Sequence, residues 1–361
     1  MGLQIGDIIS KKQIEFSDLK GKTIAVDAFN AIYQFLTTIR QPDGTPLKDS
    51  NGNVTSHLSG LFYRNLKLIL EGVKLIYVFD GEAPELKKAT HEKRKAVKEQ
   101  YKKKYEEAVA DEDIEAMGKY SRSEVSLDEL KINESKELLE AMGVAVVQAS
   151  GEGEAQASYL VKENSNMYAV ASQDYDCLMF KAPLLIQNLS MSRKRKTISG
   201  YREVFPQVIK LDEVLKELEI NQEQLICLGI LCGTDYNVGG VKGLGPKKSL
   251  KLIKEVCGGE KGEEGSKGGE KGGGYCKKIF DVLENDEKYA KYEVNFDWKE
   301  IYDEIESPNV EKDIKLDFPK VNEDKIKEIM VEGHEFSEDR IQSQLNKLDK
   351  LEREKSQQTL F

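Results

Sequence analysis

The stretch KTIAVD, residues 22–27, is apolar and rich in β-branched residues, and it ends on an aspartate. Three further stretches have a similar form: KLIYVFD (74–80), VAVVQAS (144–150) and MYAVASQD (167–174). Helical patterns separate them, at residues 55–72, 132–142 and 152–164. Strands that alternate with helices predict an α/β fold with a mostly parallel central sheet flanked by helices. Ligands bind such sheets at the carboxyl ends of the strands, where Asp27, Asp80 and Asp174 fall.

The alternation is interrupted between residues 84 and 131, where Lys, Glu, Ala and Tyr are frequent and large aliphatic residues are few. We expect two long, exposed helices in this insertion. Residues 222–256 are again helical, around the turn GTDYNVGGVKGLGPKK. The segment 258–274 is rich in Gly, Glu and Lys, which is typical of a disordered surface loop.

Composition indicates an intracellular, cytoplasmic globular protein. The 361 residues are 39% hydrophobic and 33% charged, and no run approaches the roughly 18 apolar residues that span a bilayer. The five cysteines are an odd number without a CxxC pair, so neither a disulfide framework nor a zinc site is expected. We expect them to be buried, reduced thiols.

The net charge of −10 argues against a nucleic-acid partner, but the distribution of charge matters more than its sum. Nine Lys or Arg residues face two Glu between Lys87 and Lys104. Such a basic stripe binds a polyanion if the acids lie elsewhere or hold cations. A solvated helix face is the simpler interpretation of the same stripe.

Seven acidic residues stand in distinctive local settings: Asp27, Asp80, Glu152, Glu154, Asp174, Asp176 and Asp235. Two pairs among them are spaced two residues apart, which places both carboxylates within reach of shared cations. Carboxylates without nearby His or Cys suit Mg²⁺ or Mn²⁺ better than zinc. One such pair alone is more often a helix cap or plain surface, so spacing leaves both readings open.

Six motifs follow one another as in flap endonucleases: DAFNAIYQF, YVFDGEAPELK, GEGEAQASYL, SQDYDCL, GTDYN and GVKGLGPKK. The chain resembles this family, in its archaeal form, from MGLQIGDII to EFSEDRIQSQLNKL. The resemblance implies a single 5′-nuclease domain over residues 1–340. Its metal-site core would cover about 1–83 and 132–236, its helical arch about 84–131, and its helix–turn–helix-type duplex-binding region about 222–256, with a tail over 341–361.

The resemblance also implies a structure-specific 5′ flap endonuclease and 5′–3′ exonuclease. Such an enzyme hydrolyses phosphodiester bonds of branched DNA in replication (Okazaki fragment maturation) and repair, by a two-metal-ion mechanism. The seven acids would hold two Mg²⁺ ions, which Mn²⁺ can replace. Asp27, Asp80, Glu152 and Glu154 would chiefly serve one ion, and Asp174, Asp176 and Asp235 the other, with help from Glu154. Lys87 and Arg94 match positions that contact the scissile phosphate.

Several other residues match positions that contact DNA in the family. Tyr33 would stack on a base, and Arg40 and Arg64 would contact the duplex. In GVKGLGPKK, glycines allow close approach of a phosphate, and Pro246 starts a helix whose free N–H groups attract anions. The implied contacts there are Lys242, Gly243, Gly245, Lys247 and Lys248, with K⁺ bound by the loop.

The tail resembles the start of a sliding-clamp-binding box at Gln357, Leu360 and Phe361, although the aromatic pair that closes such a box is incomplete. We expect a monomer with no membrane partner. Two other classes of function compete with this reading. A ribonuclease on a similar acidic core would have no obvious use for the arch or for GVKGLGPKK. A non-catalytic DNA-binding scaffold would gain nothing from clustered carboxylates.

Overall fold

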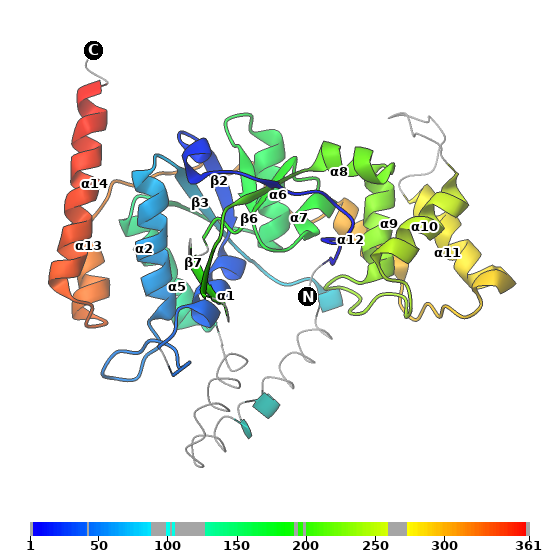
Figure 1. Cartoon of the computed structure of the whole chain (residues 1–361), viewed down its shortest axis with the longest axis horizontal. Coiled ribbons are helices and arrows are strands. Elements are labelled where there is room, and N and C mark those ends of the chain that lie inside the picture. The colour runs from blue at the N-terminus through cyan, green and yellow to red at the C-terminus, as the bar shows by residue number, and fades with distance from the viewer. Residues whose placement is uncertain are drawn as a thin grey trace.

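The computed structural model describes residues 3–41, 43–87, 99–101, 103–104, 127–190, 194–197, 200–258 and 273–358. Most of the predicted arch (84–131) and of the Gly-rich segment (258–274), together with Arg94, Leu360 and Phe361, lie outside them. Figure 1 shows a central sheet with helices on both sides and a group of helices, α9 to α12, at one end.

A seven-stranded sheet in the order β1-β9-β6-β5-β2-β3-β4 forms the centre of the molecule. Its strands are β1 Lys12–Gln13, β2 Thr23–Asp27, β3 Lys74–Phe79, β4 Ala145–Gln148, β5 Ala169–Ala171, β6 Leu184–Gln187 and β9 Gln207–Lys210. The five strands from β6 to β4 are parallel, and β9 and β1 add antiparallel pairings at one edge. The predicted mostly parallel α/β sheet is confirmed. A separate antiparallel pair consists of β7 Lys194–Thr197 and β8 Gly200–Glu203.

Alternation along the strands divides the core into two apolar layers. In β2, Ala25 packs into one cluster, while Ile24 and Val26 pack into the other. Strands buried on both faces read as nearly continuous apolar runs, which is why the sequence stretches are apolar throughout. One layer is covered by α1 Ala28–Thr38, α2 Ser56–Leu70 and α5 Glu129–Ala141, and the other by α6 Gly153–Glu163, α7 Asp176–Met179 and α8 Leu211–Leu218.

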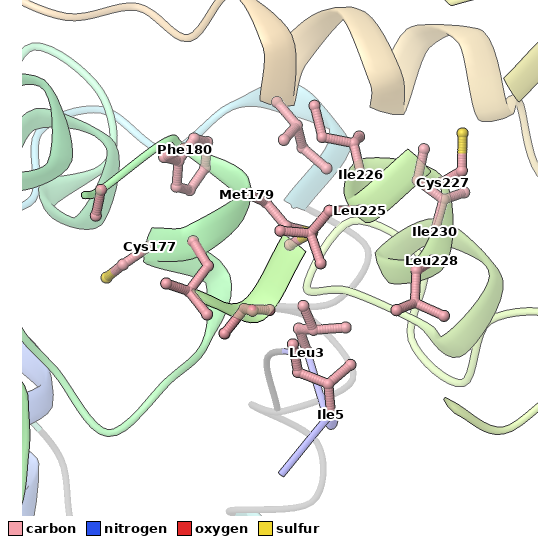
Figure 2. Close-up of a cluster of buried hydrophobic side chains, with 14 of the residues drawn as sticks. Leu3, Ile5, Cys177, Met179, Phe180, Leu225, Ile226, Cys227, Leu228 and Ile230 are labelled. Carbon is pink, nitrogen blue, oxygen red and sulfur yellow. The ribbon is translucent and has the colours of Figure 1, made fainter. Parts of the chain in front are cut away.

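The N-terminal segment is anchored in the second layer. Leu3 and Ile5 are buried against side chains of α7 and of α9 Gln222–Cys232, as Figure 2 shows. The backbone N–H of Leu3 donates a hydrogen bond of 2.6 Å to Oδ1 of Asp176. The first residues of the chain therefore help to fix one of the predicted metal ligands.

The predicted helix–turn–helix region consists of α9 and α10 Pro246–Cys257, packed with α11 Gly274–Asn285 and α12 Trp298–Glu306. Pro246 is the first residue of α10, as predicted. The prediction of reduced cysteines is wrong for one pair, because Cys227 of α9 and Cys276 of α11 form a disulfide. Both side chains belong to the same apolar cluster, between helices that pack on each other. The spacing of the cysteines in the sequence does not predict that these two lie together.

The C-terminal part runs through α13 Glu323–Lys327 and a π-helical turn η4 Glu328–Glu332 into α14 Glu338–Gln358. The boundary predicted at residue 340 falls inside α14, which packs on α2. The described residues also form short 3₁₀ turns, η1 Phe16–Leu19, η2 Glu85–Lys87 and η3 Glu287–Tyr289. Among the described residues, no helix is both long and apolar enough for a membrane span.

Candidate active site

Acidic side chains collect at one edge of the sheet. Asp27 is the last residue of β2, Asp80 follows β3, and Asp174 follows β5. Because β3, β2 and β5 are parallel neighbours, their carboxyl ends meet at the same edge. The remaining acids come from neighbouring elements: Glu152 and Glu154 at the start of α6, Asp176 at the start of α7, and Asp235 just after α9. The structure brings all seven acids close enough for their charges to interact.

Asp27 caps the helix that follows it and faces two polar neighbours. Its Oδ1 accepts the backbone N–H of Asn30 at 3.1 Å, as an N-cap residue does. The Ser172 hydroxyl lies 3.1 Å from Oδ2 of Asp27 and 3.0 Å from Oε1 of Glu154. A hydroxyl carries one proton and donates to one of the two carboxylates at a time. The other carboxylate then lacks this donor, and a proton or a cation would stabilise it.

Asp80 is held by the start of α6. The backbone N–H of Gly153 donates to its Oδ1 at 2.7 Å. A Cβ on Gly153 would lie 2.5 Å from that same oxygen, so glycine is required for this contact. Gly81 donates to the carbonyl of Gly151 at 2.6 Å, and a Cβ there would meet backbone oxygens. The glycines of GEGE and FDGE therefore let two turns approach each other closely.

A hydrogen-bonded loop presents Asp235 after α9. The Asn237 carboxamide accepts from the backbone N–H and the hydroxyl of Thr234, at 3.0 and 2.8 Å, and donates to the Ile230 carbonyl at 2.8 Å. Gly233 has a φ of 102° and lies against the backbone of Gly240, where a Cβ would be 2.6 Å from an amide nitrogen. The motif GTDYN thus builds the loop as well as supplying a carboxylate.

Lys87, in η2, reaches into the acidic group. Its ammonium forms an ion pair with Oε1 of Glu152, with side-chain exposures of 15% and 11%. Tyr236 completes the contact, because its hydroxyl donates to Oε2 of Glu152 at 2.5 Å and the Lys87 Nζ lies 4.8 Å from its ring centre. Burial lowers the pKa of Lys87, but the carboxylates of Glu152, Asp235 and Glu154 together outweigh burial and raise it, so the ammonium stays charged.

The electrostatics show an excess of buried negative charge. Burial, followed by the charge of Asp80, raises the pKa of Asp27 to about 7. Burial also raises the pKa of Asp176 to about 7 and that of Asp80 to about 6. The pKa of Glu154 is raised by burial and then by Asp27. Clustered carboxylates become fully ionised only when cations neutralise them.

The donor set fits hard divalent cations. The seven carboxylates are oxygen ligands, which Mg²⁺ and Mn²⁺ prefer. As the side chains lie, no three potential ligands in the described part of the chain are arranged to hold an ion. The carboxylate oxygens are occupied by Lys87, Ser172 and backbone N–H groups instead. Cations would have to replace some of these contacts.

The predicted DNA-contacting residues fall into two groups. Arg40 and Arg64 make internal contacts: the Arg40 guanidinium donates to the carbonyls of Thr37, Gly44 and Leu36, and Arg64 donates to that of Ser190. Tyr33 lies half-buried on α1. The second group is exposed and surrounds the start of α10: Lys242, Gly243, Gly245, Lys247 and Lys248. Gln357 lies near the end of α14, at the edge of the described chain.

Three residues of the site were missed from the sequence: Asn30, Ser172 and Tyr236. Each lies within a motif that was quoted, next to or near a predicted ligand. Each is uncharged, and its partner is distant in sequence: Asn30 reaches Asp174, Ser172 reaches Asp27, and Tyr236 reaches Glu152. Proximity to a carboxylate motif was the available signal, and it does not distinguish them from their neighbours.

Two family models match the chain, the XPG N-terminal domain over residues 2–101 and the XPG I-region over residues 143–235. Flap endonuclease 1 of Hyperthermus butylicus is 44% identical over 98% of this chain and 96% of its own. Flap endonuclease 1 of Pyrococcus furiosus is also 44% identical, over 100% of this chain and 98% of its own. The chain belongs to the flap endonuclease family. The resemblance inferred from the six motifs is therefore confirmed.

The solved structure of flap endonuclease-1 from Methanococcus jannaschii supports the same assignment. It is 36% identical, covers 98% of this chain and 100% of its own, and superposes with a TM-score of 0.72. The two family models together contain all seven acids of this flap endonuclease chain, along with Lys87 and Arg94. The acidic edge of the sheet is thus built from the parts of the chain that define the family.

Proposed function

We propose that this chain is a structure-specific nuclease that hydrolyses phosphodiester bonds at the base of 5′ flaps in DNA, with 5′–3′ exonuclease activity as well. Its place would be Okazaki fragment maturation and repair on chromosomal DNA inside the cell, as a monomer. The observation that carries the proposal is the coupled group of seven carboxylates around Lys87 in a flap endonuclease fold. Such a group can support phosphodiester hydrolysis if it holds cations next to the phosphate.

Two divalent ions, Mg²⁺ or Mn²⁺, are proposed as cofactors. Asp27, Asp80, Glu152 and Glu154 would hold one ion, and Asp174, Asp176 and Asp235 would hold the other with help from Glu154. When bound, such ions stabilise charge on the attacking and leaving oxygens of a phosphoryl transfer. The chain's own contribution is a set of carboxylates whose backbone positions are fixed on strand ends and helix starts.

Lys87 would stabilise negative charge on the scissile phosphate, together with Arg94. Its ammonium is charged and mostly buried, and it already lies among the carboxylates. Substrate binding would transfer it from Glu152 to a phosphate oxygen. A charge-assisted contact that strengthens in the transition state raises kcat more than it lowers KM.

Duplex DNA would bind along the exposed start of α10. Gly243, with a φ of 88°, precedes a helix that begins at Pro246, and Lys242, Lys247 and Lys248 are exposed around it. Backbone N–H groups and lysines are suited to phosphates, and the same loop would hold K⁺. Tyr33 would stack on a base. Arg40 and Arg64 would support the duplex through the segments they brace. A sliding clamp would bind Gln357, Leu360 and Phe361.

The test is cleavage of a 5′-end-labelled double-flap DNA with Mg²⁺, comparing the wild type with Asp174→Ala. We expect the wild type to cut near the flap base and the variant to bind without cutting. A matched RNA flap separates deoxyribonuclease from ribonuclease activity. Binding without cutting by the wild type would support a scaffold and refute the proposal, and equal cutting by both proteins would show that Asp174 is not part of the site.

A further inference from the structure

Tyr236 contacts the acidic group at Glu152. It occupies the loop after α9, next to Asp235, and packs against the apolar layer that contains α6, α7 and α9. Its hydroxyl donates to Glu152 at 2.5 Å, and its ring faces the Lys87 ammonium at 4.8 Å. One side chain therefore contacts a predicted metal ligand and a predicted catalytic cation.

The position of Tyr236 is set by its own loop. The Thr234 hydroxyl accepts the backbone N–H of Tyr236 at 3.1 Å. Asn237 holds Thr234 in turn and ties the loop to the end of α9. Because these bonds are independent of Glu152, the tyrosine is the fixed partner and the carboxylate is the one that is oriented.

Glu152 needs such a partner. Its backbone is the N-cap of α6, but its side chain makes no capping bond. Lys87 contacts Oε1 and Tyr236 contacts Oε2, so the two oxygens are held from different sides. Loss of the hydroxyl would leave Glu152 oriented by the Lys87 ammonium alone, which substrate is proposed to remove.

We propose that Tyr236 is a positioning residue with two separable contacts. Its hydroxyl fixes the Glu152 carboxylate for cation binding, and its ring holds the Lys87 ammonium at the edge of the carboxylate group. The part played in turnover rests on the proposed nuclease function. The part played in cation binding rests only on the proposed ligand role of Glu152, whether or not the chain cuts flaps.

Two substitutions separate the contacts. Tyr236→Phe keeps the ring and its packing but removes the hydroxyl, and Tyr236→Leu removes both. Because Tyr236→Phe removes a hydrogen bond to a charged group, it should weaken Mg²⁺ binding by about tenfold or more in calorimetry. A cation–π contact is weaker, so Tyr236→Leu should lower the single-turnover rate at saturating Mg²⁺ by roughly a further threefold.

Making the same two substitutions in a Lys87→Ala protein tests whether the Tyr236 ring acts through Lys87. In Lys87→Ala protein, Tyr236→Leu and Tyr236→Phe should give the same single-turnover rate. Tyr289→Phe is the matched control, because the Tyr289 hydroxyl donates to Glu255 at 3.0 Å and Lys288 lies 4.8 Å from its ring, with no predicted ligand involved. It should leave Mg²⁺ binding and rate unchanged.

The outcomes distinguish this proposal from the proposed function. Normal Mg²⁺ affinity in Tyr236→Phe, with intact flap cleavage by the wild type, would overturn the hydroxyl's role and leave the nuclease assignment standing. A rate difference between the two variants that persists without Lys87 would overturn the ring's role. If the wild type binds Mg²⁺ but cuts no flap, the nuclease assignment fails, while calorimetry of Tyr236→Phe still decides the contact with Glu152.

Discussion

Asn30 donates its side-chain amide to Oδ2 of Asp174 over 3.1 Å, although 144 residues separate them. The same residue donates its backbone N–H to Asp27 and accepts the backbone N–H of Gln173 at 3.2 Å. It therefore links the end of β2 to the loop that follows β5. Since we propose different ions for Asp27 and Asp174, we expect Asn30 to fix the relation between the two proposed ion sites.

Asn30→Leu removes the side-chain bonds without a large change in volume. The backbone bond to Asp27 remains, while Asp174 and the Gln173 N–H lose a partner. Each lost bond at a partly buried site lowers the free energy of unfolding by about 1 kcal/mol. We expect lower stability in urea and weaker Mg²⁺ binding, measured by calorimetry. Asn285→Leu, which loses a carboxamide bond to the Asp281 carbonyl, is the control and should change Mg²⁺ binding little. Unchanged Mg²⁺ affinity in Asn30→Leu would refute the linking role.

Much of this site is predictable because local sequence patterns determine where its strands end and where its helices begin. Asp27, Asp80 and Asp174 follow apolar strands, and the rule that parallel strands end at one edge brings them together without any knowledge of side chains. The start of α6 at Glu152 and that of α10 at Pro246 follow from local signals of the same kind. The functional reading, in contrast, came from the resemblance, because spacing alone left capping and metal binding equally open.

The contacts of uncharged side chains were not predictable. Nothing in DAFNAIYQF indicates that Asn30 reaches Asp174, because side-chain direction across a sheet depends on register and packing. The resemblance implied duplex contacts for Arg40 and Arg64, yet their guanidinium groups donate to the backbone carbonyls of Gly44 and Ser190. The disulfide between Cys227 and Cys276 depends on how α9 packs with α11, which no local pattern encodes.

The stability of the metal-free protein should depend on pH. The pKa values of Asp27 and Asp176 are raised to about 7 and that of Asp80 to about 6, so the folded state binds more protons than the unfolded state above pH 4. This contribution is fully present below pH 4 and is lost as pH rises through about 7. In EDTA, Tm should therefore be higher at pH 5.5 than at pH 8. His57, whose pKa is lowered by burial, works in the opposite direction.

The control for this pH dependence is neutralisation of one carboxylate. Asp176→Asn cannot ionise, so its Tm in EDTA should fall less between pH 5.5 and pH 8 than that of the wild type. Saturating Mg²⁺ should flatten the wild-type profile, because bound cations stabilise the ionised carboxylates. An Asp176→Asn profile as steep as that of the wild type would contradict the assignment of the effect to the acidic group.

The cysteines offer a direct count. With Cys227 and Cys276 bonded, a thiol reagent should label three cysteines in denaturant without reductant, and five after reduction. Removing a cross-link stabilises the unfolded state, so a reductant should lower the free energy of unfolding by about 2–4 kcal/mol. Cys227→Ala should abolish that response to reductant, whereas Cys232→Ala should retain it. Five labelled cysteines before reduction would show that the pair is reduced in solution.

Lys87 should matter for stability in the metal-free protein and for turnover in the metal-bound protein. Its ammonium is attracted to Glu152, Asp235 and Glu154, so in EDTA it is the cation that offsets their repulsion. Breaking a buried ion pair by removing one partner costs about 3 kcal/mol. Lys87→Met keeps much of the apolar stem and should lower the Tm in EDTA at pH 8.

Saturating Mg²⁺ should reduce the stability difference between Lys87→Met and the wild type, because divalent cations take over the neutralising role. Saturating Mg²⁺ should not restore turnover in the same way. A contact to the phosphate that strengthens in the transition state predicts a large loss in kcat with little change in KM, even when Mg²⁺ saturates. Lys181→Met, which breaks the ion pair with Glu306 at 2.6 Å, is the control and should leave kcat unchanged. Equal losses of affinity and rate in Lys87→Met would make Lys87 a simple phosphate holder.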